Sequence, residues 1–277
     1  AWIDHLVKRG NMVVYPLYQD SLRTPLGDFT PNAIAATRAA IRTLEEQPDH
    51  VRPQLDKVAV AGHSMGGVIS ANMAALWKSE NLPALRAVMC VEPGKTWGNA
   101  TRAKAILADL SKIPAKTLLL TVVGDKDHVV RDIDARRIFL ESVQVPPSNK
   151  NYIELVSDDH GSPTLTANHF APAAWAELPP GTAQPTEANE GPLRRKLRER
   201  LEERRGEGEE SENLGQSKRS LDALDFYGTW KLLDALTDAA FHGTNRNYAL
   251  GNTPEQRFMG VWSDGVPVKP LIATERP

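Results

Sequence analysis

The stretch "KVAVAGHSMGG", residues 57–67, decides the fold. Its first part, 57–62, is an apolar run of strand type, and an apolar segment of helical type, 65–78, follows it. The serine of "GHSMG" therefore falls at a tight turn from a buried strand into a helix, which raises its hydroxyl above the sheet edge. We take Ser64 as the candidate nucleophile and the backbone N–H of Met65 as a candidate donor to a developing oxyanion.

Composition sets bounds on the class of protein. The chain has 277 residues, of which 41% are hydrophobic and 25% charged, and this is enough to bury a core as one domain. A formal net charge of −2 gives no electrostatic reason to expect nucleic acid as a partner, and no apolar stretch is long enough to span a membrane. The single cysteine, Cys90, cannot form an internal disulfide, and we interpret it as a core residue.

Strand-like and helix-like segments alternate over the first 170 residues. The predicted strands are 12–18, 57–62, 85–92, 116–124 and 151–156. The predicted helices are 31–47, 65–78, about 99–110 and 131–142, with a short helix before Gly10. Near-continuous Val, Leu and Ile strands that alternate with helices indicate an α/β fold, with a mostly parallel sheet covered by helices on both faces.

The pattern changes after residue 170. A loop-like segment and then a charge run fill 171–220, which we predict to be a flexible charged insertion. An amphipathic helix resumes at 221–241, with an interruption at Gly228, and an irregular tail follows it. The expected organisation is an α/β core over 1–170, the insertion, and a last helix of the core with its tail over 221–277.

A serine nucleophile needs a base, and the base needs an acid that orients it. Asp125 and Asp127 both follow the fourth predicted strand, at the edge where sites on parallel sheets lie, and we favour Asp127. His160 comes directly after the fifth predicted strand and is the favoured base, with His169 as the alternative. The expected catalytic set is therefore Ser64, Asp127 and His160.

Further side chains are candidates for contact with a substrate at the same edge. They are Trp97, Tyr18, His63 and His128. The sequence has no HExxH motif and no cysteine pair, and "SDDH" offers metal ligands only in one cramped loop, so we expect no metal. It has no glycine-rich dinucleotide or phosphate motif, so we expect no nucleotide cofactor.

The elbow "GHSMGG", the acid turn "GDKD", the histidine loop "DDHGS" and the strand order together resemble the α/β-hydrolase superfamily. Within it, the chain is most similar to dienelactone hydrolase, chlorophyllase and cutinase-like esterases, which have no large cap domain. The resemblance implies a serine ester hydrolase with an acyl-enzyme intermediate, no cofactor, and a small-molecule or lipid-like ester as substrate. The alternatives are an acyltransferase or amidase with the same residues, and a non-catalytic binding protein of this fold.

The chain departs from this family at its front. In the family, a strand that carries an HG-type loop precedes the first helix and supplies a second oxyanion donor. Nothing in residues 1–11 matches that strand. We expect the complete protein to have further sequence upstream, including this strand, which would lie between 12–18 and 57–62. The compartment and the particular ester stay open.

Overall fold

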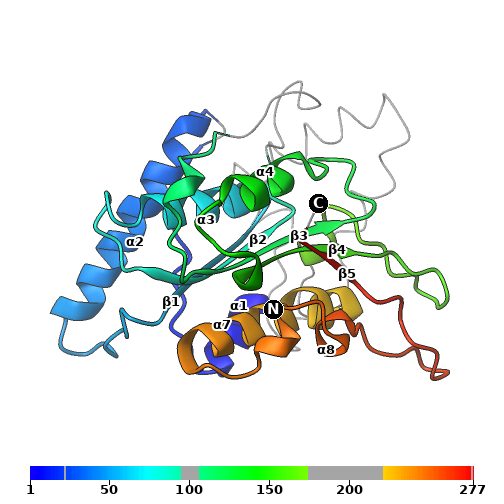
Figure 1. Cartoon of the computed structure of the whole chain (residues 1–277). Coiled ribbons are helices and arrows are strands. Elements are labelled where there is room, and N and C mark those ends of the chain that lie inside the picture. The colour runs from blue at the N-terminus through cyan, green and yellow to red at the C-terminus, as the bar shows by residue number, and fades with distance from the viewer. Residues whose placement is uncertain (22, 95–105, 174–220, 276) are drawn as a thin grey trace, which may run out of the picture.

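The computed structural model describes residues 1–21, 23–94, 106–173, 221–275 and 277, and it shows a sheet between two layers of helices (Figure 1). The strands, in spatial order, are β1 (Val58–His63), β2 (Leu85–Val91), β3 (Leu118–Gly124), β4 (Lys150–Leu155) and β5 (Ile272–Thr274). The first four are parallel to one another, and β5 is antiparallel to β4. The predicted α/β fold class and four of the five predicted strands are confirmed.

The apolar runs of the central strands cover both faces of the sheet. On β2, Met89 and Val91 face one core cluster, whereas Val88 and Cys90 face the other. This alternation is the two-residue period of a strand, and both faces are apolar because helices cover both. Cys90 is fully buried, as expected of a core residue, and burial raises the pKa of its thiol to about 12.

Two groups of helices cover the two faces (Figure 1). One face carries α2 (Phe29–Glu46), α3 (Met65–Leu76) and α4 (Ile133–Glu141). The other carries α1 (Trp2–Lys8), the π-helix η6 (Leu224–Trp230), α7 (Lys231–His242) and α8 (Pro254–Arg257). Short 3-10 turns connect these elements: η1 (Leu26–Asp28), η2 (Leu110–Lys112), η3 (Pro147–Asn149), η4 (Ala171–Ala173) and η7 (Arg246–Tyr248).

The predicted strand at 12–18 is wrong. This segment forms no strand, and Tyr15 and Leu17 are 82% and 76% exposed. A β-prone sequence needs a neighbouring strand to complete its hydrogen bonds, and no strand of the described residues lies beside it. For the same reason β1 is an edge strand, with β2 as its one paired neighbour in the part of the chain that the structure describes.

Three smaller predictions also differ from the structure. The helix expected at about 99–110 lies mostly outside the described residues, and in its described part, 106–110, only Leu110 is helical, as the first residue of η2. The tail contains β5, whose three residues are too few to give a sequence pattern. Gly228 does not interrupt its helix but lies in η6, where an added Cβ would be 2.9 Å from the Leu155 side chain.

The charged insertion predicted at 171–220 falls outside the described residues beyond Ala173. Chain on both sides of it belongs to one core, because Leu232 and Leu236 of α7 pack in the same cluster as Met89 and Leu120 of the sheet. Among the described residues, no helix has the length and apolar character needed to cross a bilayer.

Candidate active site

Ser64 occupies the turn between β1 and α3 in a strained conformation. Its φ of 58° and ψ of −124° lie in a region that residues other than glycine rarely adopt. The backbone N–H of Ser64 donates to the Val91 carbonyl of β2 at 2.9 Å, which fixes the turn to the sheet. The serine hydroxyl is therefore held at the carboxyl edge of the parallel strands, where loops from several strands meet.

The close approach of strand and helix at this turn explains one motif glycine. A Cβ built on Gly62 would lie 2.2 Å from the carbonyl oxygen of Gly66, which is backbone and cannot turn aside. A Cβ built on Gly66 would meet no described atom within 4 Å. The tight turn therefore requires a residue without a side chain at Gly62 and not at Gly66.

A chain of hydrogen bonds connects Ser64 to a carboxylate through His169. The Nε2 atom of His169 is 3.1 Å from Ser64 Oγ, and its Nδ1 atom is 2.9 Å from Asp127 Oδ2. The other oxygen of Asp127 accepts from the backbone N–H groups of Val129 and Val130 at 2.9 and 3.0 Å. Because an ionised Asp127 can only accept, Nδ1 carries the proton and Nε2 is free to accept the serine proton.

The choice of His160 as the partner of Ser64 is corrected by this geometry. The Nε2 atom of His160 is 2.8 Å from Asp264 Oδ2, and its side chain is 41% exposed. His169, which we had kept as the alternative, takes the position between Ser64 and Asp127.

The reason lies in how the chain returns after β4. Asp158 and Leu165 exchange two backbone hydrogen bonds of 2.8 Å, so the polar segment between them, with His160 inside it, loops outward. The chain then returns to the sheet edge, where Lys126 N–H donates to the Ala167 carbonyl at 3.0 Å and brings His169 beside the acid turn. Leu165 and Ala167 are buried, and these apolar residues before His169 were the sequence signal that could have favoured it over His160.

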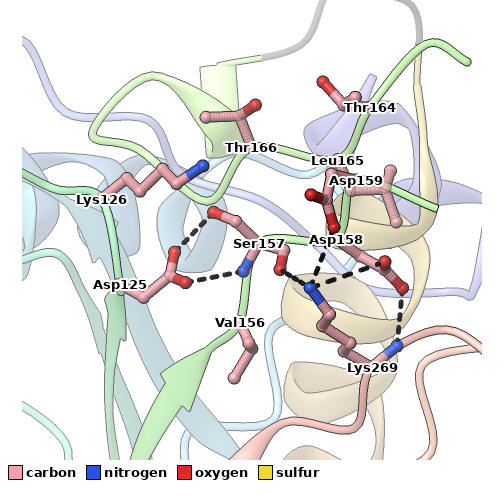
Figure 2. Close-up of a pocket in the computed structure, with 10 residues that line it drawn as sticks. All are labelled: Asp125, Lys126, Val156, Ser157, Asp158, Asp159, Thr164, Leu165, Thr166 and Lys269. Carbon is pink, nitrogen blue, oxygen red and sulfur yellow. Dashed lines mark hydrogen bonds and ion pairs between the residues drawn. The ribbon is translucent and has the colours of Figure 1, made fainter. Parts of the chain in front are cut away.

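The alternative acid, Asp125, faces a different partner (Figure 2). Its carboxylate accepts from the backbone N–H of Ser157 at 2.9 Å and from the Ser157 hydroxyl at 2.5 Å. These groups line a polar hollow of about 400 Å³ beside the ends of β3 and β4, where Lys269 also contacts Asp158 and Asp159. Asp125 therefore ties the acid turn to the loop after β4 and does not reach His169.

Met65 is the first residue of α3, and its backbone N–H has no helical acceptor. No hydrogen bond of the described residues uses this N–H. It lies directly after the nucleophile position, as an oxyanion donor must in a strand–turn–helix site.

Of the four side chains expected to contact a substrate, the structure brings only one of those it describes, His63, into contact with His169. Trp97 lies outside the described residues. Tyr18 is half-buried and packs on Phe29, with their ring centres 5.2 Å apart. His128 is exposed beside Asp127. His63 turns toward His169, with its Nε2 atom 2.7 Å from the His169 carbonyl oxygen.

Sequence reasoning missed Glu92, which directly follows β2. Its side chain is 1% exposed, and Oε2 lies 3.2 Å from His63 Nε2 and 3.7 Å from His169 Nδ1. Burial raises the pKa of Glu92 and the charge of Asp127 adds to this, whereas His63 and His169 act in the opposite direction. The available signal was its position: an acidic residue immediately after a buried parallel strand lies at the same edge as Ser64 and Asp127.

Three side chains at the site also have the composition of a metal site. Potential ligand atoms of His63, Glu92 and His169 lie within 4.8 Å of one another. However, both ring nitrogens of His169 and the Nε2 atom of His63 already take part in the hydrogen bonds given above. The arrangement therefore fits a hydrogen-bonded cluster, and a metal would have to displace its contacts.

Comparison with known proteins agrees with this fold. Residues 1–130 match the profile of a protein family described as alpha/beta hydrolase fold. This match and the described sheet are consistent with a member of the α/β-hydrolase superfamily. No protein of curated function matches it significantly.

Several solved structures are similar to part of this chain. A fungal esterase from Rhizomucor miehei is 18% identical, with 46% of this chain and 51% of that chain covered and a TM-score of 0.34. A thermostable esterase from Pseudomonas putida is 19% identical, with 50% and 51% covered and a TM-score of 0.34. A putative dienelactone hydrolase from Klebsiella pneumoniae is 13% identical, with 48% and 49% covered and a TM-score of 0.30.

The chain spans about half the length of these three solved proteins.

Proposed function

We propose that this protein is a serine hydrolase that cleaves carboxylic esters through an acyl-enzyme intermediate on Ser64. His169 is the general base and acid, Asp127 orients it, and the backbone N–H of Met65 donates to the oxyanion. The observation that carries the proposal is the unbroken hydrogen-bond chain from Ser64 Oγ through His169 to Asp127, with the serine held in a strained turn. A strained nucleophile whose base is in turn oriented by a carboxylate is the recognised arrangement for acyl transfer.

The reaction follows from the roles of these groups. Ser64 Oγ attacks the ester carbonyl carbon while its proton passes to His169 Nε2, and the carbonyl oxygen becomes an oxyanion beside the N–H of Met65. The tetrahedral intermediate then breaks its bond to the leaving alkoxide, which takes the proton from His169 and departs as the alcohol.

Water completes the cycle. It gives a proton to His169, attacks the acyl carbon, and releases the carboxylic acid as Ser64 recovers its proton. Asp127 accepts the Nδ1–H hydrogen bond throughout and stabilises the imidazolium that forms in each half of the cycle. No cofactor takes part in this proposal.

The two histidines provide a matched test. We expect wild-type protein to react with a fluorophosphonate probe and to hydrolyse a short-chain nitrophenyl ester, and Ser64→Ala to do neither. His169→Ala should lower turnover on the order of 10⁴–10⁶-fold. His160→Ala removes an exposed pair with Asp264 and a ring contact with Trp262, neither of which involves Ser64, and should change turnover less than about 3-fold. Loss of activity in His160→Ala with retention in His169→Ala would overturn the assignment.

A competing alcohol or amine in the assay separates hydrolysis from acyl transfer, because the acyl-enzyme is common to both. Dominant formation of a new ester or amide in the presence of water would replace hydrolysis by acyl transfer as the function.

A further inference from the structure

We propose that Glu92 is a second carboxylate partner of His169, a positioning residue that shares with Asp127 the stabilisation of the imidazolium. This inference rests on the proposed function and adds a residue to it. The Nδ1 atom of His169 faces two carboxylates, Asp127 Oδ2 at 2.9 Å and Glu92 Oε2 at 3.7 Å. The first is a direct hydrogen bond, and the second is an ion-pair distance that needs only a small shift to become one.

The surrounding backbone holds Glu92 firmly in this place. Its N–H donates to the Val122 carbonyl of β3 at 2.7 Å, and its φ of 44° is unusual for a residue with a side chain. Gly124 leaves the room that the carboxylate occupies, since a Cβ there would lie 2.9 Å from Glu92 Oε1. Backbone strain of this kind persists only where the surrounding contacts enforce it, and it concentrates at functional sites.

A purely structural role explains Glu92 poorly. Its Oε1 atom is buried and has no hydrogen-bond partner among the described residues, which costs on the order of 1–3 kcal/mol compared with a satisfied group. A glutamine or an apolar side chain of similar size would fill the space without a buried carboxylate. A carboxylate there is useful if it interacts with a positive charge that appears during the reaction.

His169 provides that charge when it takes the Ser64 proton. Among the residues that the structure describes, the titratable groups that face Glu92 are His63, His169 and Asp127, and the first two favour its ionised form. Protonation of His169 therefore strengthens the interaction just as the imidazolium forms, which lowers the barrier to proton transfer.

His63 joins the two ends of this cluster. Because a carbonyl can only accept, the Nε2–H of His63 donates to the His169 carbonyl at 2.7 Å, and the same N–H lies 3.2 Å from Glu92 Oε2. His63 thus fixes the backbone of His169 relative to Glu92.

Replacement of the two carboxylates, singly and together, tests this role. Asp127→Asn should lower kcat/KM only about 10²–10³-fold, less than the roughly 10⁴-fold loss expected where one carboxylate orients the base, because Glu92 can accept the Nδ1–H. Glu92→Gln should lower it about 3–10-fold. The double variant should be at least 10-fold less active than the product of the single effects.

The control is Glu154→Gln, the same substitution at another partly buried glutamate of the sheet, whose pKa burial also raises. It should leave kcat/KM unchanged. A double variant whose loss equals the product of the single losses, or a Glu92→Gln effect no larger than that of Glu154→Gln, would overturn the inference.

The pKa of the His169 imidazole, followed by NMR titration, is a readout that does not depend on turnover. Loss of the Glu92 charge should move this titration to lower pH, and Glu154→Gln should leave it unchanged. An unchanged His169 pKa in Glu92→Gln refutes the role of Glu92. By contrast, absence of fluorophosphonate labelling at Ser64 in wild type refutes the proposed function, whatever the titration shows.

Discussion

The two glycines that flank Ser64 should respond in opposite directions to the same substitution. In Gly62→Ala the new Cβ would lie 2.2, 2.3 and 2.9 Å from the O, C and Cα atoms of Gly66. Ordinary contacts are near 3.5 Å, so the strand and the start of α3 must separate by about 1 Å. The Gly62 backbone belongs to β1 and the Gly66 backbone to α3, so neither can shift without moving the strand or the helix that contains it.

The cost follows from the rigidity of these elements. Overpacking of a core side chain costs about 1–3 kcal/mol, and a collision with backbone should exceed that range, so we expect Gly62→Ala to lower the free energy of unfolding by about 3 kcal/mol or more. For a chain of this size that is a fall in Tm of roughly 6–12 °C. Fluorophosphonate labelling should fall as well, because Ser64 shares the displaced turn.

Gly66→Ala is the control. Its Cβ meets no described atom within 4 Å, and the residue lies in the first turn of α3, where alanine is favoured over glycine by up to about 1 kcal/mol. Tm should stay constant or rise slightly. Thermal and urea unfolding of both variants test this prediction. If Gly66→Ala is the less stable of the two, the close approach of β1 and α3 is not the reason for a glycine at position 62.

Three further predictions concern stability. Glu92→Gln should remove a pH dependence of stability. The raised pKa of Glu92 means that the native state holds this proton more tightly than the unfolded state does, so the free energy of unfolding of the wild type falls relative to that of the variant as pH rises above 4.5. Urea titrations at several pH values measure this difference. Lys231→Met should lower the free energy of unfolding by about 2 kcal/mol, since Nζ donates to the carbonyls of Glu255, Gln256 and Phe258; equal stability would show that this anchor is dispensable. Ser64→Gly should be more stable than Ser64→Ala by about 1 kcal/mol, because only glycine is unstrained at this φ; calorimetry in which alanine is the more stable would contradict it.

The sequence predicted correctly those strands and turns that depend only on a local pattern of residues. The strands β1 to β4 are short apolar runs, and the turn at Ser64 is a local motif, so both can be recognised without knowledge of the rest of the chain. Asp127 was chosen over Asp125 from its distance beyond the strand end, and the structure brings Asp127 to His169.

The errors arise where a position depends on distant partners. Residues 12–18 have strand-like composition but no neighbouring strand among the described residues, so composition alone misleads. His160 was favoured because it is nearer to its strand end, yet the bridge between Asp158 and Leu165 carries it outward and brings His169 back. Glu92 was missed because its role depends on contacts with histidines 29 and 77 positions away.

The hydrogen bonds at the strand ends explain why these loops meet so closely. The pairing of the sheet continues beyond the strands: Ser64 N–H donates to Val91 O, and Glu92 N–H donates to Val122 O. Ser64, the proposed nucleophile, and Glu92, the proposed second carboxylate, therefore lie on extensions of the sheet and share its rigidity.

His169 has no such support, since it lies 14 residues beyond β4, where its loop is held by the bond from Lys126 N–H to Ala167 O and by the His63 side chain. Because positioning errors of about 1 Å can cost 10²-fold in rate, a shift of the loop that carries His169, the proposed base, should lower activity more than a similar shift elsewhere in the site. His63→Ala should accordingly lower kcat strongly while it changes the free energy of unfolding little. A large fall in the free energy of unfolding together with the fall in kcat would show that His63 supports the fold and not the position of His169.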